Sequence, residues 1–344
     1  MCNNMCEKQP LVGIIVPVYN VEPYVSRCLD SLLNNTYNNF LLFCVNDGST
    51  DNSAAVVEEY AKRDKRIILI EQENQGVSSA RNNGLKAAFE KNCDVIGFVD
   101  SDDWVYPQYI EILLSGILDG YDISMCEYIR TDKYIMGQFI SECRKDKFDN
   151  SDAIENDNLR QTVWAKLFRS ELVKDICFKN ITSDEDVLYN IGIYATHKVK
   201  ICCFPLKLYY YFFDERCTLS KRNGYQSGIV YGNEIIRLLN NKNCLELMKP
   251  FLVKNGLSTC MKFRYFSKFT NEYQKYKAEY NNLMKEIWGI AKERKIRIKN
   301  KFVLKLFTYF PSLYRLFRIA TDRTMLNFER NQKARMRNEN SNNL

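Results

Sequence analysis

The chain has 344 residues, of which 46% are hydrophobic and 26% are charged, proportions that are typical of a folded protein and exclude a disordered one. Its net charge of +7 is unevenly distributed, because residues 241–344 hold 23 basic and 8 acidic residues whereas residues 1–240 hold 26 and 34. An acidic body followed by a basic region indicates a partner with an anionic surface, either a membrane or a nucleic acid.

Cysteine and histidine usage limits the chemistry that is open to this chain. The thirteen cysteines are scattered, no Cys-x-x-Cys pair is present and no signal peptide is recognised, a pattern typical of a reducing cytoplasm. Cys44, Cys126 and Cys202 lie among apolar neighbours and are expected to be core residues. His197 is the only histidine, so acid or base chemistry must use carboxylates. No apolar run is long enough to predict a transmembrane helix.

Alternating strands and helices are predicted in the first hundred residues. Apolar, β-branched runs predict strands at residues 11–18, 40–45, 67–70 and 95–99. Apolar periodicity and capping residues predict helices at 22–34, from about 50–53 to 63, and from 78 or 79 to 90. This alternation favours an open parallel sheet with right-handed crossovers.

Polar residues follow each predicted strand, at the edge where such a sheet binds its ligand. They are Tyr19 and Asn20, Asp47, Gln75 and Gly76, and Asp100, Ser101, Asp102 and Asp103. The last group crowds three carboxylates, which repel each other unless a cation is bound. An Asp-x-Asp pair at a strand end is typical of a Mg²⁺ or Mn²⁺ site that also binds a diphosphate. Taken alone, however, these residues are more simply a solvated acidic turn, with Ser101 or Asp103 capping the next helix.

Beyond residue 105 the predicted elements are less regular. A helix is predicted from Tyr109, a strand at 123–128, and either a strand or a helix at 162–168, whereas 130–160 gives little to place. Residues 184–186 form a second acidic triplet at a helix start, where capping by Ser183 or Asp184 is the simpler interpretation. An aromatic strand is predicted at 201–213.

From about residue 225 the pattern becomes helical and increasingly basic. Residues 298–320 are basic, aromatic and amphipathic, and contain Pro311. Such a segment can lie in a membrane interface, and a terminal helical pair that closes the core is an equal alternative. Residues 331–344 are polar and expected to be disordered.

Five ordered motifs resemble the family 2 glycosyltransferases with the GT-A fold. They are LVGIIVPVYN (11–20), NDGSTDN (46–52), NQGVSSARNNG (74–84), FVDSDDW (98–104) and SDEDVLY (183–189). The resemblance is strong across about residues 10–125, moderate across 160–220 and weak or absent beyond. It implies an α/β fold with an open, mostly parallel nucleotide-binding sheet flanked by helices, followed by a basic helical region. Residues 1–220 would form the GT-A domain, with a nucleotide-sugar half (1–125) and an acceptor half (126–220), and 221–330 the helical region.

The resemblance also implies an activity and roles for matching residues. Members of the family transfer a sugar from a nucleotide diphosphate donor, with inversion at the anomeric carbon, and use a divalent metal. Asn46 stands where relatives often have another acid, which leaves the nucleoside contact resting more on Asp47. Trp104 and Trp164 could stack on a sugar ring, although either aromatic is more often a core residue. The implied roles are Pro17, Tyr19 and Asp47 around the nucleoside, Gly76 and Arg81 beside the nucleotide, Asp100 near ribose and metal, Asp102 on the metal, Ser101 and Trp104 as further substrate contacts, Asp186 as the base, and Glu185 as its neighbour.

These inferences predict a cytoplasmic, inverting glycosyltransferase that uses a UDP-sugar and Mn²⁺ or Mg²⁺. We expect it to build a surface or capsular-type polysaccharide on a lipid-linked saccharide acceptor, with peripheral contact to the cytoplasmic face of the cell membrane through residues 298–320. One alternative is a sugar-nucleotide nucleotidyltransferase, which would normally carry a Gly-rich phosphate loop where this chain has Pro17 to Asn20. The other is a nucleic-acid-binding protein that uses the basic region, but the polar strand ends have no role there. No nucleic-acid partner is therefore expected, and the sequence predicts no oligomeric state.

Overall fold

The computed structural model describes residues 9–134, 145–156, 158–181, 184–213, 225–257 and 273–294, which belong to two compact units. The larger unit contains the described residues up to Tyr231 together with Asn240–Lys249, and the smaller contains Gly232–Leu239 and the described residues from Pro250 on. The predicted domain boundary at 220, the amphipathic segment 298–320 and the tail 331–344 all lie outside the described residues. The predictions made for them stay predictions.

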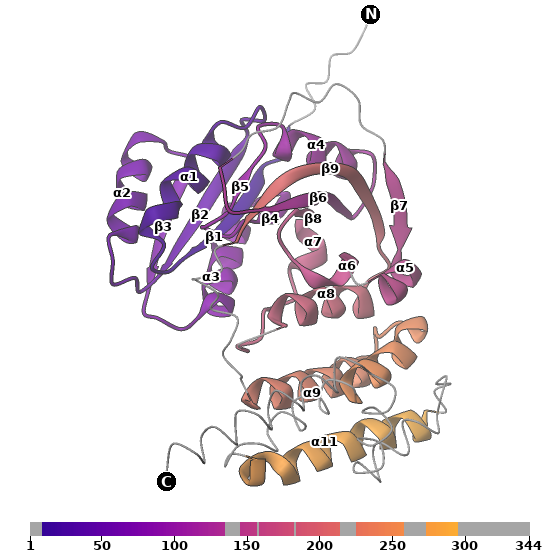
Figure 1. The fold of residues 1–344 in the computed structure, drawn as a ribbon. Helices are drawn as coiled ribbons and strands as arrows, with labels where there is room; N and C mark the ends of the chain where they lie inside the picture. Colours follow the sequence, from indigo (N-terminus) through magenta and orange to yellow (C-terminus); the bar gives the residue numbers. More distant parts are fainter. Residues whose placement is uncertain are drawn as a thin grey trace, which may run out of the picture. The chain divides into compact units, whose positions relative to one another are not determined.

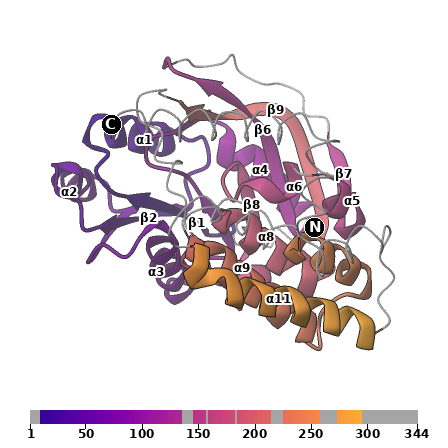
Figure 2. The same cartoon turned by 60° about the horizontal axis from the view of Figure 1, so that its bottom comes forward.

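Four parallel strands form the first half of the larger unit (Figure 1). They are β1 (Val12–Val18), β2 (Phe40–Asp47), β3 (Ile67–Gln72) and β4 (Val95–Phe98), in the order β3-β2-β1-β4. Their crossovers contain α1 (Glu22–Leu33), α2 (Ser53–Arg63) and α3 (Val77–Glu90). The connection from β3 to β4 runs back across the sheet, so right-handed crossovers put α3 on the face opposite α1 and α2, as Figures 1 and 2 show.

The packing of this half follows directly from its sequence. Every residue of β1 is buried, as expected of a central strand with apolar side chains on both faces. Gly84 lets α3 approach the sheet, because a Cβ built there would lie 2.5 Å from Cγ2 of Ile15. Cys44, Cys126 and Cys202 are buried, as predicted, and are free thiols.

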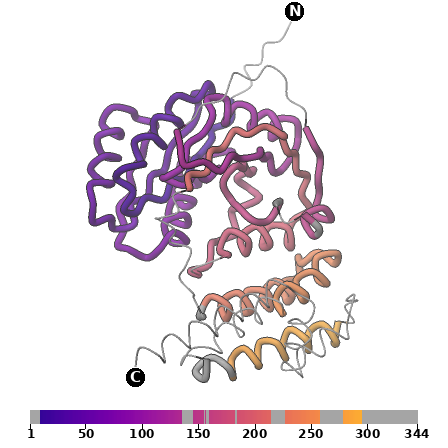
Figure 3. Tube along the Cα trace, viewed as in Figure 1, coloured from indigo at the N-terminus to yellow at the C-terminus, as the bar shows by residue number. Residues whose placement is uncertain are grey.

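The second half of the larger unit makes the sheet mixed. The strand β8 (Lys166–Arg169) pairs antiparallel with both β4 and β6 (Ile123–Thr131), and β6 runs parallel to the long, curved β9 (Lys200–Phe212). Two short strands, β5 (Trp104–Val105) and β7 (Asp146–Asp149), pair antiparallel with β9. Residues 162–168, for which strand and helix were both open, therefore contribute a strand, and Figure 3 traces the chain between the two halves.

The remaining helices surround this second half or belong to the smaller unit. The former are α4 (Tyr109–Leu118), α5 (Asn150–Glu155), α6 (Asn158–Gln161), α7 (Ser170–Val173), α8 (Glu185–Thr196) and the 3₁₀ helix η2 (Glu246–Met248). The helix α9 (Tyr225–Asn240) begins in the larger unit, and α11 (Tyr273–Glu293) lies in the smaller one. Within the smaller unit, a Cβ added to Gly256 would lie 2.8 Å from Ile235 and 3.2 Å from Ile287, so residues 249–257 pack closely on α9 and α11. None of the helices in the described ranges has the length and apolar character needed to cross a membrane.

Candidate functional site

Asp47 joins the end of β2 to the start of α3. Its Oδ1 accepts hydrogen bonds from Gln75 N (2.7 Å) and Gln72 Nε2 (2.7 Å), and its Oδ2 accepts one from Gly76 N (2.8 Å). Gly76 has a φ of +90°, a conformation that glycine adopts without steric cost. Two residues predicted to lie beside a nucleotide are thus hydrogen-bonded to each other.

The loop after β1 is tied to the loop after β2. Asn20 Oδ1 accepts a hydrogen bond from Thr50 N (2.8 Å), and Val21 N donates to Ser53 Oγ (2.8 Å). Tyr19 is exposed at this loop, whereas Pro17 is buried within β1 opposite Val45. The ring of Tyr19 is therefore accessible at the sheet edge, and Pro17 belongs to the strand behind it.

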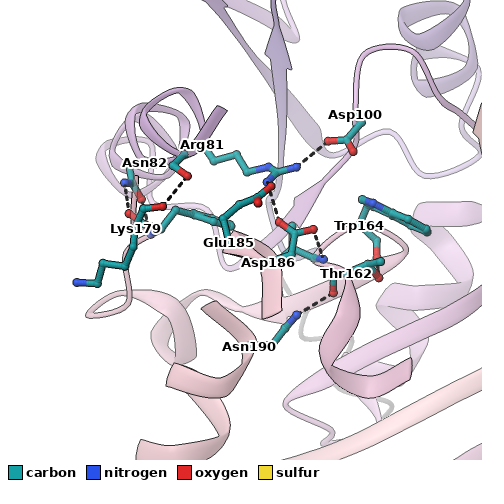
Figure 4. Close-up of polar contacts among 12 residues, drawn as sticks. Arg81, Asn82, Asp100, Thr162, Trp164, Lys179, Glu185, Asp186 and Asn190 are labelled. Atoms are coloured by element: carbon teal, nitrogen blue, oxygen red, sulfur yellow. Dashed lines mark hydrogen bonds and ion pairs between the residues drawn. The ribbon is translucent and has the colours of Figure 1, made fainter. Parts of the chain in front are cut away.

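Arg81 on α3 brings the two acidic motifs together, as Figure 4 shows. Its Nη2 lies 2.9 Å from Oδ1 of Asp100, and its Nη1 lies 2.7 Å from Oδ1 of Asp186 and 3.3 Å from Oε1 of Glu185. The Arg81 side chain is only 4% exposed. One buried guanidinium therefore connects Asp100, two residues after the end of β4, with the first turn of α8.

The electrostatics of this cluster follow from burial and from the ion pairs. Burial alone lowers the pKa of Arg81, but the carboxylates of Asp186, Asp100 and Glu185 together raise it above its ordinary value. Burial raises the pKa of Asp186 to about 7, although Arg81 opposes this shift. Oδ2 of Asp186 accepts a hydrogen bond from Val163 N (3.2 Å), so both carboxylate oxygens are held. Arg81 is thus a permanent cation next to a carboxylate that can gain and lose a proton near neutral pH.

Asp102 and Asp103 have different environments. Arg27 donates to the backbone carbonyl of Asp102 (2.6 Å), and burial together with the nearby Asp100 raises the pKa of Asp102 to about 6. Asp103 is fully buried and accepts hydrogen bonds from Tyr209 Oη (2.5 Å) and Phe212 N (2.8 Å). The expectation that Asp103 caps the next helix is wrong, because α4 begins only at Tyr109 and Asp103 instead anchors β9.

Asp100 and Asp102 fit a hard divalent cation of the Mg²⁺ or Mn²⁺ type. No group of three or more His, Cys, Asp or Glu suited to a metal occurs in the described part of the chain. Such cations nevertheless need only one or two protein carboxylates when waters and substrate phosphates supply the other oxygens. Burial raises the pKa of Asp102, but at about 6 it still leaves the carboxylate mostly ionised at neutral pH, whereas Asp100 gives one oxygen to Arg81.

The structure puts Trp104 and Ser101 inside the protein. Trp104 is completely buried in β5, where its ring stacks on Tyr210 at 5.4 Å and Arg27 lies 4.2 Å from its ring centre. Trp104 is therefore a core residue, the alternative given above, and not a sugar-stacking one. Ser101 is also buried.

Two residues that sequence reasoning missed support the segment that contacts Asp186. The buried amine of Lys166 donates to the carbonyls of Leu159 (2.8 Å) and Thr162 (2.5 Å), and burial lowers the pKa of Lys166 to about 7. Asn190 Nδ2 donates to the carbonyls of Arg160 and Thr162, both at 2.9 Å. These bonds hold the segment whose Val163 N contacts Asp186. The sequence signal that could have identified Lys166 was a single lysine among apolar residues.

Comparison with known proteins agrees with the family resemblance of the sequence motifs. Residues 13–177 match the family model described as Glycosyl transferase family 2. EpsH of Bacillus subtilis is 39% identical over 171 residues, which cover 48% of this chain and 48% of EpsH. The glycosyltransferase GlyA of Streptococcus pneumoniae is 35% identical over 216 residues, which cover 58% of this chain and 30% of GlyA. The matches thus span about half or less of these relatives' lengths.

Solved structures show the same fold. The structure of S. aureus TarS 1–349 in complex with UDP-GlcNAc has a TM-score of 0.65 and 22% identity, over 87% of each chain. The mannosyltransferase PcManGT of Pyrobaculum calidifontis, in complex with GDP-Man and Mn²⁺, has a TM-score of 0.51 and 15% identity, over 95% of this chain and 87% of PcManGT. At these identities the likeness concerns the fold, and it confirms the predicted fold class.

Proposed function

This chain carries a family 2 glycosyltransferase domain with the GT-A fold, and on that premise we propose that it transfers a sugar, with inversion, from a UDP-sugar to a hydroxyl of a saccharide acceptor. One observation carries the proposal: the buried Arg81 holds Asp100, from the candidate metal motif, beside Asp186. Transfer between two substrates needs a donor site and a proton acceptor next to each other, and this contact supports both in one place.

The residues of the first two loops are the proposed donor contacts. Asp47 and Gly76 shape the turn before α3, whose N-terminus favours an anionic group, and Tyr19 presents an exposed ring at the same edge of the sheet. The complexes of TarS with UDP-GlcNAc and of PcManGT with GDP-Man support a nucleotide-sugar donor, and the higher TM-score of TarS favours a UDP-sugar. Asp100 and Asp102 would hold Mn²⁺ or Mg²⁺, which supplies positive charge to offset the charge that develops on the leaving diphosphate.

Asp186 is the proposed base. The acceptor oxygen forms a bond to the anomeric carbon, the bond from that carbon to the diphosphate oxygen breaks, and the nucleoside diphosphate leaves with the bonding electrons. The proton of the acceptor hydroxyl passes to the carboxylate of Asp186. A pKa of about 7 suits this role, because about half of the molecules then carry the ionised carboxylate at neutral pH and the group is basic enough to take the proton. Arg81 holds the carboxylate in position and also pairs with Glu185, whose negative charge helps to raise the pKa of Asp186.

The acceptor and the location are proposed from the distribution of charge along the chain. The basic residues of 241–344 favour an anionic surface, which supports a lipid-linked saccharide acceptor at the cytoplasmic face of a membrane. Deletion of residues 298–344 tests this part separately: we expect the truncated protein to leave the membrane fraction, and retention there would contradict membrane contact through 298–320.

Titration calorimetry tests the donor and metal assignments. We expect UDP to bind more tightly than GDP or TDP in the presence of Mn²⁺ or Mg²⁺, and Asp102→Asn to weaken metal-dependent UDP binding at least tenfold because it removes a charged oxygen ligand. Asp186→Asn should bind UDP and metal normally but abolish transfer. Asp119→Asn, at the exposed end of α4, is the matched control. Absence of nucleotide binding by the wild-type protein would refute the proposal, and substantial transfer by Asp186→Asn would refute the base assignment.

A further inference from the structure

Tyr128 on β6 exposes its ring although its neighbours in the fold are aromatic and largely buried. The residue is 48% exposed, and its ring lies nearly perpendicular to that of Trp164, with the ring centres 4.9 Å apart and an angle of 88° between the planes. Trp164 stacks in turn on Tyr209 at 4.7 Å and on Tyr211 at 5.5 Å. We call Tyr128, Trp164, Tyr209 and Tyr211 the aromatic platform. Tyr128 is its most exposed member, and its ring is nearly perpendicular to the stacked rings that it contacts.

An irregularity in the sheet gives Tyr128 this position. The register between β6 and β9 shifts on both sides of Glu127, so that Cys126 lies opposite Phe204 whereas Tyr128 lies opposite Tyr209. Such bulges interrupt the hydrogen-bond ladder and redirect side chains, and they are frequent next to active sites. Here the redirected side chain meets Trp164. Ala165, which follows Trp164 in the chain, has a φ of +57°, a conformation that is unfavourable for a residue with a Cβ.

The aromatic platform adjoins both acidic motifs. Tyr209 Oη accepts a hydrogen bond from Asp100 N (3.1 Å) and donates to Asp103. Trp164 directly follows Val163, whose N–H donates to Asp186, and Figure 4 shows its ring near Thr162 and Asp186 with Asp100 above. A molecule that stacks on the platform would therefore lie beside the base.

The chemistry of the platform indicates what it binds. A pyranose ring has an apolar face of C–H groups and a rim of hydroxyls, so it can cover an aromatic ring while its hydroxyls stay free to form hydrogen bonds. Single exposed aromatics are common on protein surfaces, but this one contacts a stack in which Tyr209 is hydrogen-bonded to Asp100 and Asp103. An anionic ligand is less suited, because Asp100, Asp102 and Asp103 lie nearby.

We propose that the aromatic platform is the acceptor subsite, and that a pyranose ring of the acceptor stacks on Tyr128 and presents its hydroxyl to Asp186. This rests on the proposed function, which does not itself assign acceptor residues. Tyr128 sets how firmly and in what orientation the acceptor is bound, and it takes no part in proton transfer.

Saturation-transfer NMR on the full chain with UDP and Mn²⁺ tests the proposal without requiring turnover. The probes are the octyl β-glycosides of glucose, galactose, mannose and N-acetylglucosamine. We expect at least one to receive saturation at its ring C–H protons from the wild-type protein and Tyr128→Phe, and to lose it with Tyr128→Ala. Leu118→Ala, an exposed apolar side chain on α4, is the control and should behave like the wild type.

Transfer kinetics with the bound glycoside give the second readout. We expect Tyr128→Ala to raise KM for the glycoside about tenfold, the size of one aromatic contact, while kcat and KM for the donor stay within about twofold. Calorimetric UDP binding should be the same in all variants, and its absence in the wild type would mean that the proposed function has failed. If UDP binds but no glycoside does, or if Tyr128→Ala binds glycosides as well as the wild type, the acceptor subsite is refuted.

Discussion

Replacing Arg81 with methionine should destabilise the protein more than any surface substitution. The change removes the buried cation shared by Asp100, Glu185 and Asp186 but keeps a side chain of similar length. Removing one partner of a buried ion pair costs about 3–5 kcal/mol, because the remaining charge is left without compensation. Domains typically have about 5–15 kcal/mol of stability in total. We therefore expect a loss of about 3–5 kcal/mol at pH 8.

The loss should become smaller on acidification. In the wild type, burial already raises the pKa of Asp186 to about 7, and Arg81 limits this shift. Without Arg81 the pKa of Asp186 rises further. The pKa of this carboxyl is 3.8 in the unfolded chain and about 7 or higher in the folded protein. At pH values between the two, the native state binds a proton that the unfolded state does not, so stability increases as pH falls. Both proteins gain on acidification from pH 8 to pH 5, and the Arg81→Met variant gains more.

Urea unfolding followed by tryptophan fluorescence at pH 8 and pH 5 measures both effects. The double variant Arg81→Met with Asp186→Asn should recover part of the loss at pH 8, because one uncompensated charge is gone. Arg63→Met, which breaks only an exposed pair with Glu59, is the matched control and should cost less than about 1 kcal/mol. A loss below about 1 kcal/mol for Arg81→Met, or an equal loss at both pH values, would refute the reasoning.

Three further predictions concern the base, its support and the packing of the sheet. The kcat/KM of the wild type should rise with pH and level off above about 7, because Asp186 must be ionised; a flat profile between pH 5.5 and 8 would contradict its role. Lys166→Met should lower the free energy of unfolding in urea by about 1–3 kcal/mol, because the carbonyls of Leu159 and Thr162 lose their donor. It should also remove the increase in stability between pH 7 and 10 that the lowered pKa of Lys166 produces. An unchanged pH dependence of stability would contradict this assignment. Gly84→Val should cost at least about 1–3 kcal/mol, because its Cβ would overlap Ile15. Gly289→Ala on α11 should instead stabilise by up to about 1 kcal/mol, because the added Cβ would have no atom of a neighbouring described segment within 4 Å. Equal melting temperatures for the two variants would argue against close packing at Gly84.

Much of the fold could be predicted because its signals are local. The apolar run of β1 is too short for a helix and too apolar for an exposed strand, and similar runs recur at β2, β3 and β4. Helical periodicity between them leaves a βα alternation that only a few topologies accommodate. The antiparallel pairing of β8 with β4 and β6 was not predictable, because a four-residue strand carries no mark of its partner or direction.

Part of the candidate site could be predicted for the same reason. Residues at the carboxyl ends of parallel strands meet at one edge, so the placement of Asp47 and Asp100 follows from the strand assignments. The contacts that each side chain makes could not be predicted in this way. Asp103 was a candidate helix cap but is buried against Tyr209, and Trp104 was a candidate sugar contact but lies in the core. The sequence near these residues could not show this, because the strand that buries them, β9, lies about a hundred residues later in the chain.

By itself, then, the sequence determined the βα framework and the acidic residues at its functional edge, since both depend on side-chain patterns within a few residues. Only the tertiary structure decided how these residues work together. Arg81 meets Glu185 and Asp186 across 104 and 105 positions, and Tyr209 meets Asp100 across 109. Such contacts are created by the crossovers and by the register of β9, and a chain with the same local patterns but another register would not form them.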